Sequence, residues 1–274
     1  MRTIKKPFHF KGTAPYLAKE VKMVVRPCDD LYFVVNKVEI PVNPDHLKFN
    51  NGFHTTLVAN SKAKVGSTEH LLSALWGMGI DGARIELSDE EVPTINGHAQ
   101  TFVDLIKGAG EVEIAGEVGE LKVKETIVFD DGTGSLAILR PLEKDECSSM
   151  SALIQFHEVI GEQYYKVDLT PEAYEKEICW ARTFFRKAMD VKSWEKVKKR
   201  IPALPKKIED SPVLAWRDGG WITPPRVNTE PVRHKILDAI GDLACLGKRI
   251  KGHITLVRPG HEFNRKLVMY LDKL

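Results

Sequence analysis

Two polar side chains in an apolar segment near the C-terminus have a spacing that suits a metal ion. His234 and Asp238 are four residues apart within residues 231–246, which the hydrophobic pattern predicts to be a helix, so both lie on one helix face. A histidine nitrogen and a carboxylate oxygen are ligands that zinc accepts. A solvated pair on a helix surface gives the same pattern. Asp242, one turn further on, favours a functional face because a carboxylate on an apolar helix needs a partner.

Two other histidines stand beside expected element boundaries. Glu69 and His70 open an apolar segment predicted to be helical over residues 68–79. This pair fits metal-assisted hydrolysis, but it also fits an acidic residue favoured by the helix dipole beside a surface histidine. Neither H-E-x-x-H nor H-x-x-E-H is present. His261 follows a glycine after a strand expected at 252–257, which suits an exposed catalytic imidazole or an ordinary turn histidine.

The composition excludes several classes of protein. Of the 274 residues, 43% are hydrophobic and 28% charged, which allows a substantial core and argues against disorder. Lys and Arg number 40 against 38 Asp and Glu, so we do not expect a nucleic-acid partner. The four cysteines include no C-x-x-C pair, which fits a reducing compartment. Because there is neither a membrane-length apolar run nor a signal-peptide pattern, we expect a cytoplasmic protein without a membrane span.

These residues must be positioned by the secondary structure around them. The sequence predicts strands together with helices in each half of the chain. The first half is expected to contain strands at 20–25, 31–35 and 84–87 and helices at 68–79 and 100–107. The second half is expected to contain strands at 122–129, 135–139, 151–156 and 252–257 and helices at 171–189 and 231–246. Residues 108–120 include four glycines and are predicted to be the linker. This order favours an α+β fold over alternating βαβ units.

Five motifs, taken together, resemble one enzyme family. They are Ser67-Thr-Glu-His-Leu-Leu-Ser-Ala-Leu-Trp-Gly-Met-Gly, Glu91-Val-Pro-Thr-Ile-Asn-Gly, Ala181-Arg-Thr-Phe, Val232-Arg-His-Lys-Ile-Leu-Asp-Ala-Ile-Gly-Asp-Leu and Gly260-His-Glu-Phe-Asn-Arg-Lys-Leu. In order and spacing they resemble the zinc-dependent UDP-3-O-acyl-N-acetylglucosamine deacetylases of lipid A biosynthesis over nearly the whole chain. The ordered set is specific, although no single motif is.

The resemblance implies a catalytic metal site. It assigns His70, His234 and Asp238 as the ligands of one Zn²⁺ per chain, with Fe²⁺ as an alternative in the cell. Three protein ligands and one open position for water are typical of a catalytic zinc site. In the family, the glutamate before the first ligand is the general base, and here this residue is Glu69.

The resemblance also assigns the remaining site residues. The second catalytic imidazole corresponds to His261, and the aspartate that orients it corresponds to Asp242. Thr183 and Lys235 correspond to residues that contact the developing oxyanion or the substrate. Phe184 corresponds to a residue that lines the substrate site.

The fold that the resemblance implies has two α+β domains of similar architecture, each a sheet layered with helices, with the active site between them. We place these domains at residues 1–112 and 113–274. An insertion in the second domain is expected to form a hydrophobic passage for the acyl chain. Two family loops differ here, since the glycine-rich loop has no match near residues 205–212 and the N-terminal loop is replaced by residues 11–19.

The predicted function is hydrolysis of the N-acetyl amide of an acylated UDP-sugar by a monomeric enzyme. One alternative is a paralogous deacetylase acting on another N-acetylated sugar conjugate, which the altered glycine-rich loop motivates. The other is a binding homologue that keeps the pocket without turnover. The complete set of expected ligands and catalytic residues disfavours this last alternative, because a degenerate homologue is expected to lose at least one of them.

Overall fold

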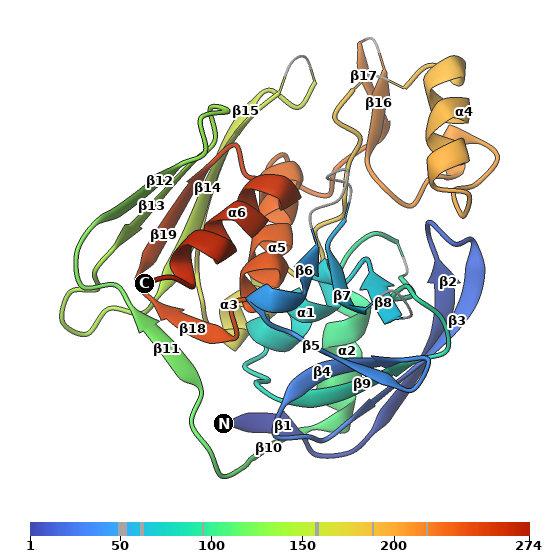
Figure 1. Ribbon diagram of the computed structural model, residues 1–274. Coiled ribbons are helices and arrows are strands. Elements are labelled where there is room, and N and C mark those ends of the chain that lie inside the picture. Colours follow the sequence, from blue (N-terminus) through green and yellow to red (C-terminus); the bar gives the residue numbers. More distant parts are fainter. Residues whose placement is uncertain (49–53, 61–62, 95, 157–158, 188, 218) are drawn as a thin grey trace.

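The computed structural model describes residues 1–48, 54–60, 63–94, 96–156, 159–187, 189–217 and 219–274. Within these residues, each half of the chain contains a five-stranded sheet (Figure 1). The first sheet has the order β2-β3-β9-β4-β5 and consists of β2 (Phe8–Ala14), β3 (Lys19–Arg26), β9 (Ala83–Leu87), β4 (Leu31–Val35) and β5 (Val38–Pro41). The second has the order β12-β13-β19-β14-β15 and consists of β12 (Ile127–Asp130), β13 (Leu136–Arg140), β19 (His253–Val257), β14 (Ser149–Gln155) and β15 (Glu162–Asp168).

The two sheets share one topology. In the first, β4 and β9 run parallel and the other neighbouring strands run antiparallel. In the second, the parallel pair is β14 and β19, at the equivalent position. In each half a helix precedes the central strand and another follows it: α1 (Glu69–Gly77) and α2 (Gln100–Ala109), then α5 (Glu230–Ala244) and α6 (His261–Leu271). The predicted α+β class with two similar halves is therefore confirmed.

Shorter elements connect and extend the halves. Strand β1 (Arg2–Ile4) pairs with β10 (Glu111–Glu113), and β11 (Gly119–Lys122) pairs with β18 (Lys248–Lys251). A small sheet before α1 contains β6 (Leu47–Lys48), β7 (Thr56–Asn60) and β8 (Ala63–Gly66), preceded by the 3₁₀ turn Pro44–His46. The insertion before α5 contains α3 (Pro171–Glu177), α4 (Val191–Arg200), the 3₁₀ turn Ile208–Asp210, β16 (Ala215–Arg217) and β17 (Gly220–Thr223). In the described part of the chain, no helix is long and apolar enough to cross a membrane.

One predicted helix, residues 171–189, was wrong in length. It begins as expected, with Thr170 as its cap, but α3 ends at Glu177. The following segment is held by other parts of the chain: the Thr183 N–H donates to the Gly97 carbonyl at 2.8 Å, and Phe184 forms a strand bridge with Leu214. These long-range backbone bonds replace helical ones.

The predicted strand 122–129 is divided between two sheets. Its first residue ends β11, which pairs with β18, whereas its last residues belong to β12, which pairs with β13. Between these two strands the chain passes from one sheet to another, so a single apolar pattern in the sequence covers two separate strands.

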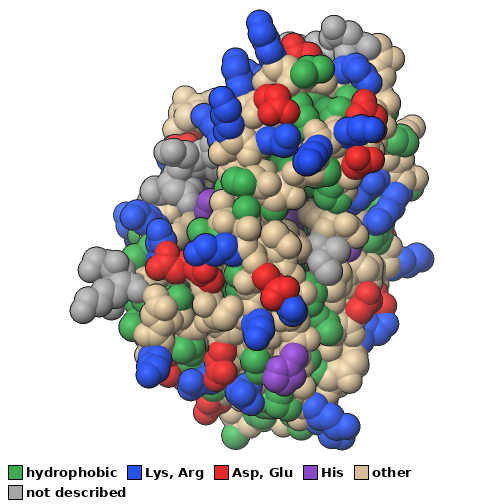
Figure 2. Space-filling model, turned by 90° about the vertical axis from the view of Figure 1, so that its right-hand side faces the viewer, with side chains coloured by type: hydrophobic (Ala, Val, Ile, Leu, Met, Phe, Trp, Pro, Cys, Tyr) green, Lys and Arg blue, Asp and Glu red, His purple; other side chains and the backbone are tan. Residues whose placement is uncertain are grey.

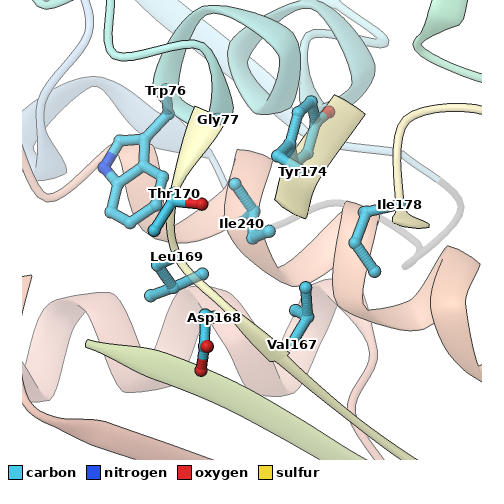
Figure 3. A pocket seen from close by; sticks show the side chains of 9 residues that line it. All are labelled: Trp76, Gly77, Val167, Asp168, Leu169, Thr170, Tyr174, Ile178 and Ile240. Atoms are coloured by element: carbon cyan, nitrogen blue, oxygen red, sulfur yellow. The ribbon is translucent and has the colours of Figure 1, made fainter. Parts of the chain in front are cut away.

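Helices α1 and α5 meet at the centre of the molecule without large side chains between their backbones. A Cβ atom added at Gly241 would overlap the carbonyl oxygen of Glu69. Nearby, Figure 3 shows Tyr174 of α3 beside Gly77 of α1, together with Ile240 of α5. The buried Tyr174 hydroxyl hydrogen-bonds Ser73 Oγ at 2.8 Å. We call the contact between α1 and α5 the seam. It joins the two halves of the chain within one continuous apolar core.

Gly241→Ala is expected to lower the free energy of unfolding by about 3 kcal/mol, the upper part of the range for overpacking. The added methyl group meets backbone, which cannot rotate away as a side chain can. Urea denaturation of both proteins measures the difference. Gly108→Ala in α2 is the control, because its new Cβ meets nothing within 4 Å and alanine favours the helix by up to about 1 kcal/mol. Equal midpoints for the two variants would contradict the close approach of α1 and α5.

Candidate active site

Three potential metal ligands from the two halves converge at the seam. His70 lies in the first turn of α1, whereas His234 and Asp238 lie on one face of α5. Asp238 Oδ1 is 3.4 Å from His70 Nε2 and 3.2 Å from His234 Nε2, and one ligand atom from each residue lies within 4.8 Å of the others. His234 and Asp238 are buried, so they are not the solvated helix-surface pair that their spacing also allowed.

These residues fit a divalent cation. The carbonyl of Ala181 lies 3.0 Å from His234 Nδ1, which favours a proton on that nitrogen and leaves Nε2 free to coordinate. Asp238 Oδ1 is buried without a hydrogen-bond donor of normal geometry among the described residues. Two imidazole nitrogens and one carboxylate oxygen match the donors and the number of protein ligands at catalytic zinc sites.

Neighbouring cations and imidazoles keep the carboxylate of Asp238 ionised. Burial alone would raise its pKa, but His234, Lys235 and His261 hold the pKa of Asp238 well below its usual range. Lys235 Nζ donates to Asp238 Oδ2 at 2.6 Å. Burial lowers the pKa of His234, which favours the neutral imidazole that a metal needs.

Glu69 lies next in sequence to the candidate ligand His70 and lines the same cleft. It is the first residue of α1 and is buried, and its Oε2 accepts the backbone N–H of Thr55 at 2.9 Å. Neighbouring residues of a helix point about 100° apart, so the carboxylate does not point in the same direction as His70. Both side chains line one cleft.

His261 and Asp242 form a buried pair next to Asp238, whose Oδ2 is 3.8 Å from His261 Nε2. Asp242 Oδ2 is 2.9 Å from His261 Nδ1 and accepts Asn264 Nδ2 at 2.8 Å, while its other oxygen accepts the Thr55 hydroxyl. Although burial opposes the charged imidazole, Asp242 and Asp238 raise the pKa of His261 to about 9. The imidazole is buried rather than exposed, because it opens α6 where that helix packs on α5.

Thr183, Phe184 and Lys235 lie in the same cleft. Lys235 Nζ is 5.7 Å from the centre of the Phe184 ring, and this ring is 6.4 Å from that of His234. Thr183 approaches Gly97 of the first half so closely that a Cβ atom there would contact its methyl group at 2.8 Å. All nine residues expected at the site therefore lie in one region of the structure.

The cleft has a volume of about 1030 Å³ and extends beyond Phe184 towards α4. Its far end is lined by Met189, Val197, Ile201 and Leu204. The near end contains the polar cluster, whereas the lining next to α4 is mainly apolar and includes one cation, Arg200; we call this part the apolar end of the cleft.

Two residues that hold the His261–Asp242 pair in place, Thr55 and Asn264, are not predicted from the sequence. Asn264 lies one turn after His261 in the same motif, and that spacing was a usable signal. Thr55 gave no signal, because two adjacent threonines, Thr55 and Thr56, are ordinary in a strand-rich region. Thr55 nevertheless donates its hydroxyl to Asp242 and its N–H to Glu69.

The role of the buried carboxylate of Glu91 is also not predicted from the sequence, where Glu91 appears only as part of a motif that carries the family resemblance. It accepts the N–H groups of Tyr16 at 3.1 Å and Leu17 at 2.9 Å, and the hydroxyl of Ser67 at 2.7 Å. Ser67 has a φ of 56°, which is unfavourable for a residue with a Cβ. Glu91 therefore ties the N-terminal loop to the strained residue that leads into α1.

Comparison with known proteins identifies relatives of one kind. The model of the UDP-3-O-acyl N-acetylglycosamine deacetylase family matches residues 1–273. Similar proteins include the UDP-3-O-acyl-N-acetylglucosamine deacetylases of Syntrophus aciditrophicus, 33% identical over 98% of this chain and 85% of the relative, and of Citrifermentans bemidjiense, 32% identical over 96% and 86%. That of Myxococcus xanthus is 33% identical over 97% of this chain and 84% of the relative. The resemblance inferred from the five motifs is confirmed, and the chain belongs to the UDP-3-O-acyl N-acetylglycosamine deacetylase family.

Proposed function

We propose that this protein hydrolyses the N-acetyl amide of a UDP-3-O-acyl-N-acetylglucosamine, giving the free amine and acetate, in lipid A biosynthesis. The convergence of His70, His234 and Asp238 beside Glu69 and His261 is the observation that supports hydrolysis. Membership of the family and the names of its relatives support the substrate.

Zn²⁺ is the ion we propose for the three ligands, with Fe²⁺ as an alternative in the cell. When bound, such an ion supplies Lewis acidity towards the amide carbonyl and the attacking water. Glu69 accepts the proton of that water. Its carboxylate is held for this task by the Thr55 N–H, and a general base of this kind contributes about 10²–10⁴ in rate.

His261 is the proposed proton donor to the leaving amine or to the developing oxyanion. Asp242 stabilises the protonated imidazole, and Thr55 and Asn264 fix the Asp242 carboxylate. Thr183 and Lys235 supply further donors where negative charge develops. Lys235 is oriented by its hydrogen bond to Asp238.

The shape of the cleft supports a substrate with one polar and one apolar end. We propose that the sugar lies at the polar cluster, against Phe184, and that the acyl chain follows the apolar lining towards α4. The insertion that carries α4 then supplies the hydrophobic passage expected from the family.

The organisation of the chain is proposed to follow the family. We place the domains at residues 1–112 and 113–274, near the point where the chain passes from β10, paired with β1, to β11, paired with β18. We propose a monomer, as expected from the sequence. We also propose the cytoplasm as the location, as expected from the sequence.

The function is tested with purified protein and a panel of substrates. We expect about one zinc per chain, and deacetylation that stops on chelation and returns with added zinc. UDP-3-O-acyl-N-acetylglucosamine should be preferred over UDP-N-acetylglucosamine without the acyl chain. Preference for another N-acetylated conjugate would favour the paralogous function, and tight binding without turnover would favour the binding homologue.

The dependence of kcat/KM on pH is expected to be bell-shaped. A hydrolase that needs one ionised base and one protonated acid gives two limbs, and here the basic limb reports loss of the proton from His261, whose pKa is raised to about 9. In Asp242→Asn the imidazolium loses its counter-charge, so the basic limb should move to lower pH by on the order of one unit or more. A basic limb that stays in place in both Asp242→Asn and His261→Ala would remove His261 from the role of proton donor.

A further inference from the structure

Positive charge is concentrated on one segment of the insertion. Residues 189–207 contain seven Lys and Arg but two Asp and Glu, in a chain whose net charge is +2, so the rest of the chain is net negative. Most of these cations are exposed, and within the described residues Lys192, Lys196 and Lys199 form no ion pair. Lys198 pairs with Glu195. We call residues 189–207 the basic face.

Residues of the basic face also line the apolar end of the cleft. The inner side of α4 buries Trp194, whose Nε1 donates to the Lys206 carbonyl at 3.1 Å, and contributes Val197 to the cleft lining. Figure 2 looks towards this side of the molecule and shows Lys and Arg side chains gathered over its upper part, around hydrophobic side chains. Val191, at the start of α4, is 81% exposed.

Helix stabilisation does not explain this distribution. Lysines in a last turn interact favourably with the helix dipole, and Lys198, Lys199 and Arg200 stand there. Lys192 is in the first turn of α4, where a positive charge is unfavourable, and Lys206 lies beyond the helix.

We infer that the basic face docks the protein on an anionic lipid bilayer, with the apolar end of the cleft beside the membrane surface. Clusters of Lys and Arg adsorb on anionic leaflets through charge, without insertion of a helix. This inference rests on the proposed function in one respect: a substrate with an acyl chain partitions towards lipid, where an apolar opening can receive it. A nucleic acid fits less well, because Trp194 is buried and offers no base-stacking surface.

The test is co-sedimentation with vesicles of phosphatidylcholine alone or with 30% phosphatidylglycerol, at low and physiological salt, without substrate. The variant Lys192→Glu/Lys196→Glu/Lys199→Glu changes exposed residues outside the cleft lining. The control Lys6→Glu/Lys22→Glu/Lys37→Glu makes the same charge change on exposed residues of the first half. Circular dichroism verifies that all three proteins are folded.

The intact protein should bind the anionic vesicles, and salt should weaken this binding. The α4 variant should lose at least about tenfold in affinity, while the control should stay close to wild type. Deacetylation of a short-chain substrate in solution should be unchanged in both, so a failure of the proposed function is seen separately. Failure to bind anionic vesicles at low salt, equal losses in both variants, or preference for single-stranded RNA over vesicles would overturn the inference.

Discussion

His234→Ala is expected to abolish both stable metal binding and deacetylation. The substitution removes one of three ligands, and it leaves Asp238 Oδ1 with a single imidazole beside it, that of His70. Two remaining protein ligands are too few for a catalytic zinc site. Metal content by mass spectrometry and kcat/KM on the acylated substrate measure the two effects.

Surface histidines supply the control for this variant. His9 is exposed on β2, so His9→Ala should keep its metal and its rate. Full zinc occupancy and a normal rate in His234→Ala would show that the ligands are wrongly assigned. His70→Ala is expected to behave like His234→Ala, because it removes the ligand supplied by the other half of the chain.

Glu69→Gln should separate catalysis from metal binding. Glutamine keeps an oxygen that can accept the Thr55 N–H, but it cannot take a proton from water at neutral pH. The metal should therefore remain while kcat falls by about 10²–10⁴. The measurements are metal content and single-turnover rate.

Glu262→Gln is a matched control for loss of negative charge near the cleft. Glu262 follows His261, lines the cleft and contacts Lys266 at 3.2 Å, with its side chain 62% exposed. This variant should keep nearly the full rate. A loss as large as that of Glu69→Gln would mean that the charge of the cleft matters and that Glu69 is not the specific proton acceptor.

Local patterns in the sequence predicted the elements better than they predicted the site. The helices around Glu69 and His234 have apolar faces of the helical period and were found correctly. The segment at Thr183 was predicted as a continuation of a helix, because nothing local indicates that its backbone bonds Gly97 of the other half. Long-range pairing decided the structure there.

The candidate metal ligands were likewise only partly predictable from local spacing. The spacing of His234 and Asp238 predicts a shared helix face, but no spacing rule connects them to His70 in the first half of the chain. That connection came from the resemblance of the whole set of motifs. Neither the helix spacing nor the set of motifs indicates Thr55, since its contact depends on where the segment before β7 lies relative to Asp242.

The seam between α1 and α5 has a consequence for the order of folding. The strands of the first five-stranded sheet all lie between Phe8 and Leu87, whereas the seam joins helices from the two halves. Contacts between distant residues require closure of long loops and form slowly. We therefore expect the first sheet to form before the seam, so that the candidate active site is completed late. Changes at Gly241 should then accelerate unfolding more than they slow folding.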